Sequence, residues 1–197
     1  MSYSLRLSCA LLLAHELHRT QTRKGSGRPY IGHLLSTAGI VIEYGCTEDE
    51  AIASLLHDAI EDQGGATTEN RIREEFGDVV AAIVKDCSDT DQTPKPPWEP
   101  RKRAYLAHLR TAPASVRLVS CADKLANVRD MIAAYRVVGE ALWERFVKDE
   151  EGLRTPAEVK PKQLWLYQAL ADEFSREPSP PMAAELSRQV RLLRDLT

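Results

Sequence analysis

One short segment of the sequence carries an imidazole and three carboxyl groups: His57, Asp58, Glu61 and Asp62. On a helix, at about 100° per residue, these four side chains would share an arc of about 140°. Carboxylates this close repel one another unless a cation or a shared proton relieves them. The segment therefore predicts a bound metal ion at one face of a helix. The opposite arc is apolar and would anchor the helix in the core: Ile52, Ala53, Leu55, Leu56, Ala59 and Ile60.

Two further segments offer ligands for such an ion. His33 stands near the start of another expected helix. Asp123 lies on a third, where Asn127 and Asp130 fall within about 60° of it. Two imidazoles with two carboxylates suit a divalent first-row metal such as manganese or iron, and they leave room for water and a substrate oxygen. The expected metal ligands are His33, His57, Asp58 and Asp123.

The acids Glu61 and Asp62 follow the expected ligands by one helical turn. From that place their carboxylates would orient or deprotonate a water molecule and protonate a leaving group. Basic residues flank the ligand segments, which favours a small anionic substrate that carries several phosphates. These basic residues are Arg23, Lys24, Arg28, Lys95, Arg101, Lys102, Arg103 and Lys124.

Helical periodicity dominates the chain, and no segment alternates as a half-buried strand would. We predict a single all-α domain, a bundle of about ten helices. Thr47 with Glu50 three residues later predicts a capping box, and Gly45 and Gly77 are typical of helix ends. The expected helices are Ser4–Thr22, Gly32–Tyr44, Glu48–Asp62, Glu69–Phe76, Val79–Cys87, Pro100–Arg110, Ser115–Ala134, Gly139–Val147, Lys160–Ser175 and Pro181–Leu196.

Composition excludes several classes of protein. A net charge of −3 over 197 residues argues against a nucleic-acid binder that relies on bulk electrostatics. No apolar run approaches the roughly 18 residues of a membrane span, and we see no signal peptide, so a cytoplasmic location is expected. The four cysteines are widely spaced without a Cys-x-x-Cys pair, which predicts free thiols. The oligomeric state stays open.

The order His, His-Asp, Asp resembles the HD superfamily of metal-dependent phosphohydrolases, over about residues 5–147. Finer motifs are similar to the hydrolase domain of RelA/SpoT proteins. A lone His-Asp pair is weak evidence, whereas a following Glu-Asp pair together with an Asp-Lys-Leu helix is specific. No synthetase, TGS or ACT module is found, so the chain looks like a stand-alone small alarmone hydrolase. The matching residues are Arg23-Lys24 with Gly27, Pro29-Tyr30 and His33; Leu55-Leu56-His57-Asp58 with Glu61-Asp62; and Ala122-Asp123-Lys124-Leu125 with Asn127 and Arg129-Asp130.

The resemblance implies a domain division, a reaction and residue roles. Residues 1–150 would form the HD-type phosphohydrolase domain, and residues 151–197 a C-terminal helical extension packed on it. The reaction would be the manganese-dependent removal of the 3′-pyrophosphate from guanosine tetra- and pentaphosphate (ppGpp and pppGpp), which leaves GDP or GTP. His33, His57, Asp58 and Asp123 would bind manganese, Glu61 and Asp62 would activate water, Arg23 and Lys24 would meet the base and phosphates, and Asn127 would contact the ribose. Lys102 and Lys124 are expected to add phosphate contacts.

Other interpretations stay open on the sequence alone. The same fold could act on an adenosine alarmone, NADPH or a nucleoside phosphate. A non-catalytic alarmone-binding or antitoxin protein would bind without releasing phosphate, although the pair Glu61-Asp62 argues against a mere binder. Lys102 and its basic neighbours could instead form a solvated face. Trp165 and Tyr167 could either pack on the core or shape the nucleotide pocket.

Overall fold

The structure, a computed structural model, describes residues 3–90, 96–147 and 155–197, and this part of the chain is helical without a β-strand. An isolated β-bridge joins Thr22 and Pro29. The all-α prediction of about ten helices is confirmed. The helices are α1 (Leu5–His18), α2 (Ile31–Glu43), α3 (Glu48–Leu56), α4 (Ala59–Asp62), α5 (Ala66–Phe76), α6 (Asp78–Cys87), α7 (Trp98–Leu109), α8 (Ala114–Val138), the 3₁₀ helix η1 (Gly139–Phe146), α9 (Pro156–Phe174) and α10 (Ala183–Leu196).

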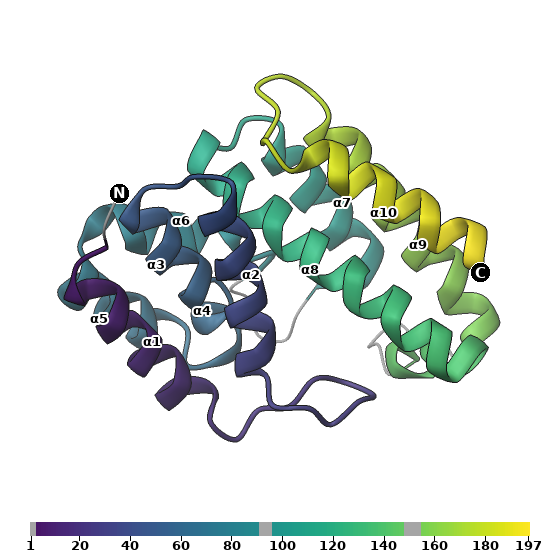
Figure 1. Cartoon of the computed structure of the whole chain (residues 1–197), viewed down its shortest axis with the longest axis horizontal. Helices are drawn as coiled ribbons and strands as arrows, with labels where there is room; N and C mark the ends of the chain where they lie inside the picture. The colour runs from purple at the N-terminus through teal and green to yellow at the C-terminus, as the bar shows by residue number, and fades with distance from the viewer. Residues whose placement is uncertain (1–2, 91–95, 148–154) are drawn as a thin grey trace.

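Two clusters of buried side chains meet along α8. The first lies mainly among α1, α2, α3, α5 and α6 and includes Leu34, Ile52 and, from α8, Val119. The second lies mainly among α7, α8, η1, α9 and α10 and includes Leu125 and Trp143. Figure 1 shows α8 running between the N-terminal helices and the pair α9 and α10. Because α8 packs on both sides, it is apolar around much of its circumference, and Asp123 and Asn127 are among the polar side chains that interrupt this pattern.

The third expected helix differs from the prediction. The capping box at Thr47 and Glu50 is present, so the helix begins as predicted. However, the expected helix Glu48–Asp62 is interrupted at His57 and Asp58, which form a turn between α3 and α4. His57 Nδ1 lies 2.8 Å from the carbonyl oxygen of Ser54, the acceptor that the Asp58 amide would use in an uninterrupted helix. The regular arc of about 140° inferred from helical geometry is therefore wrong in detail.

The first of the two C-terminal helices begins earlier than predicted, and the second begins at Ala183 rather than at Pro181. α9 starts at Pro156 rather than at Lys160, since Thr155 and Glu158 form a capping box and Pro156 occupies the first turn. Both α9 and α10 pack against α8. The expected boundary between residues 150 and 151 lies outside the described residues, as does Lys95, so the division into a domain and an extension stays a prediction. None of the described helices is long and apolar enough to span a membrane.

Arg117 ties the start of α8 to the end of α9, although nothing in the sequence distinguished it. Its side chain is only 3% exposed, and it donates hydrogen bonds to the carbonyl oxygens of Leu109, Glu173, Arg176 and Pro178, at 2.6 to 3.2 Å. A buried guanidinium that satisfies four carbonyls holds the connection between α9 and α10 against the rest of the fold.

We expect Arg117→Met to lower the free energy of unfolding by about 3 kcal/mol, because it leaves buried carbonyl groups without donors. Urea unfolding followed by circular dichroism would measure the change. Arg136→Met is the matched control, since Arg136 lies exposed on the same helix. Equal stability of the two variants would show that the buried hydrogen bonds of Arg117 contribute nothing measurable.

Candidate active site

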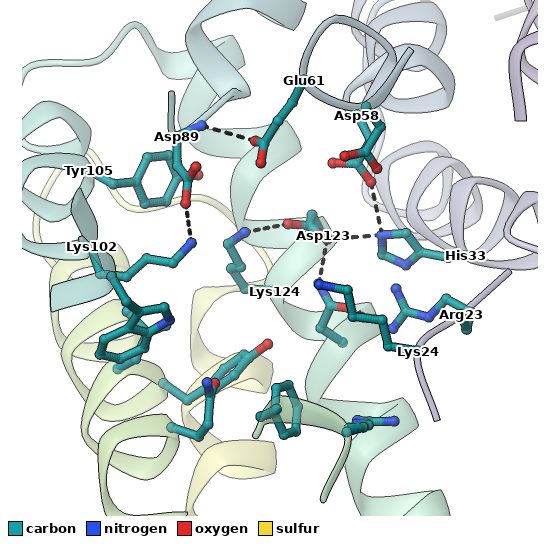
Figure 2. Close-up of a pocket in the computed structure, with 18 of the residues that line it drawn as sticks. Arg23, Lys24, His33, Asp58, Glu61, Asp89, Lys102, Tyr105, Asp123 and Lys124 are labelled. Carbon is teal, nitrogen blue, oxygen red and sulfur yellow. Dashed lines mark hydrogen bonds and ion pairs between the residues drawn. The ribbon is translucent and has the colours of Figure 1, made fainter. Parts of the chain in front are cut away.

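Four side chains from three parts of the fold converge on one point. α2 carries His33, the turn after α3 carries His57 and Asp58, and α8 carries Asp123. His33 Nε2 lies 3.1 Å from Asp123 Oδ1 and 3.6 Å from Asp58 Oδ2. His57 Nε2 lies 3.0 Å from Asp58 Oδ2 and 3.6 Å from Asp123 Oδ1. Nitrogen and oxygen donors thus alternate around one small space (Figure 2 shows three of the four residues).

The state of His57 suits a metal ligand. Its Nδ1 faces the Ser54 carbonyl oxygen, so Nδ1 carries the proton in the neutral ring and Nε2 presents a lone pair. That Nε2 atom is buried and makes no hydrogen bond with the described residues. The ligand atoms of His33, His57 and Asp58 all lie within 4.8 Å of one another, a spacing that can hold a metal ion. Two imidazoles and two carboxylates fit a divalent first-row ion.

Electrostatics favour the charged carboxylates. Burial by itself would raise the pKa of Asp58, but the positive charge that the neighbouring His57 ring carries in its protonated form outweighs it and lowers that pKa. Asp123 follows the same pattern: burial opposes ionisation, while the Lys124 ammonium and the two histidines hold its pKa well below the ordinary value. Both aspartates are therefore ionised at neutral pH, as metal ligation requires.

Tyr30 holds one of the expected ligands, Asp58, by a hydrogen bond. Its hydroxyl donates to Asp58 Oδ2 at 2.6 Å, and its ring stacks on the buried His18 with ring centroids 5.4 Å apart. Burial and the neighbouring Asp58 charge raise the pKa of Tyr30, so the hydroxyl remains a donor. Tyr30 was noticed in the sequence only as part of a motif, and the structure gives it a contact to an expected ligand.

We expect Tyr30→Phe to weaken the binding of a divalent metal by about tenfold, since it removes a hydrogen bond that fixes a ligating carboxylate. Titration of metal-stripped protein by calorimetry would measure the affinity. Tyr44→Phe serves as the control because Tyr44 is an exposed tyrosine at the end of α2. An unchanged affinity in Tyr30→Phe would exclude a role for the hydroxyl in holding Asp58.

The two acids beyond the ligands have different neighbours. Asp62 Oδ2 accepts a hydrogen bond from Gln21 Nε2 at 2.7 Å, and Gln21 is itself held by Gln63 Nε2 at 2.5 Å. Glu61 Oε2 accepts from the backbone amide of Asp89 at 3.4 Å. Sequence reasoning missed Gln21 because a neutral amide in a loop carries no distinguishing pattern.

Three of the expected ligands (His33, Asp58 and Asp123) and both acids line a cavity of about 480 Å³ whose wall is rich in basic side chains, whereas His57 is buried and does not line it. Figure 2 shows Arg23 and Lys24 on the same side as His33, and Lys102 on the opposite side beside Asp89 and Tyr105. Lys124 extends between them and contacts Asp123 Oδ2 at 2.5 Å. The expected substrate-binding residues all line this cavity: Arg23, Lys24, Lys102, Lys124 and Asn127.

Several expected contact residues already interact with one another. Arg23 donates to Asn127 Oδ1 at 2.7 Å, and Asn127 Nδ2 donates to Asp123 Oδ1 at 2.6 Å. The loop that carries Arg23 is thereby joined to α8 and to an expected metal ligand. Tyr167 lines the cavity, whereas Trp165 packs edge-on against Trp98 with ring centroids 6.2 Å apart. Arg145 and Gln163 also line the cavity and were missed, since they lie in segments without a recognisable motif.

Comparisons with known proteins show which family and which fold the chain shares. A family model described as HD domain matches residues 10–144. A Danio rerio protein named guanosine-3′,5′-bis(diphosphate) 3′-pyrophosphohydrolase MESH1 is 36% identical over 164 residues, which cover 78% of this chain and 88% of that protein. A solved structure described as a metazoan ortholog of SpoT that hydrolyzes ppGpp has a TM-score of 0.76 at 22% identity, with coverage of 100% and 99% of the two chains. The structure of lmo0812 from Listeria monocytogenes EGD-e has a TM-score of 0.69 at 28% identity, with coverage of 83% and 99%.

Proposed function

The chain belongs to the HD domain family, and on this premise we propose that it hydrolyses guanosine 3′,5′-bis(diphosphate) and its pentaphosphate analogue at the 3′ position. One observation carries the proposal: the cluster of His33, His57, Asp58 and Asp123 borders, through all of its members except His57, a cavity that is also lined by two further carboxylates and by basic side chains. The Danio rerio relative, which is named for this reaction, supports the choice of substrate.

The proposed cofactor is manganese, held by the two histidines and the two aspartates of the cluster. The mixed nitrogen and oxygen donors and the lone pair presented by His57 Nε2 support a divalent first-row ion. When bound, the ion would polarise a phosphoryl oxygen and lower the pKa of a water molecule. Tyr30 and Lys124 fix the two carboxylates from outside the cluster.

The proton transfers fall to the two acids. Glu61 would take the proton of the water that attacks the phosphorus bonded to the 3′ oxygen. Asp62, held by Gln21, would orient that water. The bond between phosphorus and the 3′ oxygen breaks, the 3′ oxygen takes a proton from Glu61, and pyrophosphate leaves with the oxygen of water. GDP or GTP remains.

Substrate binding is assigned to the basic wall. Arg23 and Lys24 would contact the base and phosphates, and Asn127 would contact the ribose. The hydrogen bond between Arg23 and Asn127 supports this assignment, because it brings the two side chains to the same part of the cavity. Lys102 and Lys124 would contact phosphate from the other side of the cavity. A multiply phosphorylated nucleotide thus finds cations along both flanks of the reacting phosphate.

We further propose a cytoplasmic enzyme in which α9 and α10 form an extension packed on the HD domain. The free state of Cys9, Cys46, Cys87 and Cys121 is compatible with a reducing compartment. Tyr167 and Gln163 bring α9 into the cavity wall, which gives this helix a part in shaping the site.

A substrate panel tests the proposed function. Metal-stripped protein is supplied with manganese and then incubated with one compound at a time: ppGpp, pppGpp, an adenosine analogue of ppGpp, or NADPH. The products of each reaction are separated by anion-exchange chromatography. We expect pyrophosphate release from the guanosine compounds with the highest kcat/KM. Phosphate release from NADPH alone, or tight binding of ppGpp without any product, would replace the proposal with one of the alternatives.

A further inference from the structure

Asp89 is a buried carboxylate that none of the assigned roles uses. It lies after α6 in the cavity wall, and its side chain is 8% exposed. Its Oδ2 accepts hydrogen bonds from both Arg101 and Lys102 of α7, whose side chains are 14% and 20% exposed. One carboxylate therefore fixes two cations at the same place on the cavity wall.

The arrangement leaves positive charge and hydrogen-bond donors facing the cavity. Two cations against one carboxylate give this group of three side chains a net positive charge, and an ammonium has three donors while a guanidinium has five. Burial lowers the pKa of Lys102, and the Asp89 carboxylate opposes that shift. The charge of the nearby Lys124 is partly neutralised by Asp123, to which Lys124 donates a hydrogen bond.

The backbone of Asp89 contacts one of the two acids assigned to the chemistry, Glu61. The Asp89 amide donates to Glu61 Oε2, so the Asp89 segment lies next to the acid assigned to proton transfer. Figure 2 shows Asp89 and Lys102 across the cavity from His33, Arg23 and Lys24. If the nucleoside lies on the Arg23 side and the reacting phosphorus near Glu61, the next phosphate of the chain extends toward Lys102.

We infer that Arg101 and Lys102 form a subsite for the terminal phosphate of the 3′-pyrophosphoryl group, and that Asp89 is the positioning residue that holds them there. The inference rests on the proposed function, because it assumes a pyrophosphoryl group whose inner phosphorus reacts. The pyrophosphate subsite would then lie near α7, apart from the nucleoside contacts near Arg23. The buried Asp89 carboxylate would hold the cations of this anion-binding wall in place.

The test compares two products of the reaction as ligands. Calorimetry measures the binding of inorganic pyrophosphate and, separately, of GDP to the manganese-loaded full chain, with the same free manganese in both solutions. In Asp89→Asn we expect pyrophosphate affinity to fall by about tenfold and GDP affinity to stay within about twofold. Lys102→Met should give the same division between the two ligands. The backbone amide is retained in Asp89→Asn, so the contact to Glu61 is not removed.

Glu99→Gln is the matched control, since Glu99 lies in the first turn of the same helix but pairs with Arg103 on the surface. This variant should bind both ligands as the native protein does. Tighter pyrophosphate binding in Asp89→Asn would overturn the inference, because Asp89 would then compete with phosphate. An equal loss for both ligands would also overturn it, since it would indicate a merely structural role. Binding needs no turnover, so absence of ppGpp hydrolysis by the native protein would count against the proposed function alone.

Discussion

Asp123→Asn is expected to lose metal binding and turnover together, with kcat/KM for ppGpp reduced by about 10³-fold or more. Asp123 Oδ1 lies 3.1 Å from His33 Nε2 and 3.6 Å from His57 Nε2, so it faces both imidazoles of the cluster. An asparagine oxygen in its place carries no net charge and attracts a divalent cation far less. Asp58→Asn should have the same effect, because Asp58 stands opposite in the same cluster.

Metal content after dialysis, measured by mass spectrometry, and turnover in added manganese would be followed in parallel for Asp123→Asn. Circular dichroism establishes that the variant remains folded. Asp195→Asn is the control, since it removes an exposed carboxylate near the end of α10. If Asp123→Asn kept manganese-dependent turnover within tenfold of the native rate, Asp123 would not be a ligand.

Glu61→Gln should separate metal binding from chemistry. Glu61 lines the cavity next to the cluster, so its neutral replacement should leave metal affinity within about threefold of native while kcat falls by about 10²- to 10⁴-fold. The glutamine keeps the shape and can still accept the Asp89 amide, but it cannot take a proton from water.

Steady-state kinetics with a calorimetric metal titration would test this separation, and Glu74→Gln provides a surface control from α5. A fall in kcat of less than about threefold in Glu61→Gln would remove Glu61 from proton transfer. A parallel loss of metal would instead make it a ligand.

The residues of the expected metal site could be singled out in the sequence because their types and their spacing indicate that chemistry. His57 and Asp58 are adjacent, and Asp123 and Asn127 lie one helical turn apart on α8, so residue type and helical period alone point them toward a common site. The structure places Asp58, Asp123 and Asn127 at one cavity, with Asn127 donating to Asp123. His57 lies beside them, with its Nε2 3.0 Å from Asp58 Oδ2.

The helix break at His57 could not be predicted from periodicity. The break depends on the hydrogen bond between the His57 imidazole and the Ser54 carbonyl oxygen, which replaces a backbone hydrogen bond of the helix. The spacing of apolar residues does not indicate such a replacement. Trp165 and Tyr167 illustrate a related limit. Residues two apart point to different sides of a helix, and only the packing of α9 shows that Tyr167 lines the cavity while Trp165 meets Trp98.

Polar residues that act through partners distant in sequence escaped the sequence analysis altogether. Gln21 supports Asp62 from 41 positions away, and Arg117 binds carbonyls up to 61 positions away. The contacts of Asp89 with two basic side chains form only because the fold brings α7 beside it. Such pairings are set by tertiary structure, and a single polar residue carries no local signal for them.

The most direct test of the central claim is the identity of the products from ppGpp. Phosphorus NMR would follow metal-stripped protein with ppGpp before and after manganese is added. We predict no change without metal, then the appearance of inorganic pyrophosphate and GDP in equal amounts. Release of orthophosphate in place of pyrophosphate, or an unchanged ppGpp spectrum with manganese present, would contradict the assignment of this chain as a 3′-pyrophosphohydrolase.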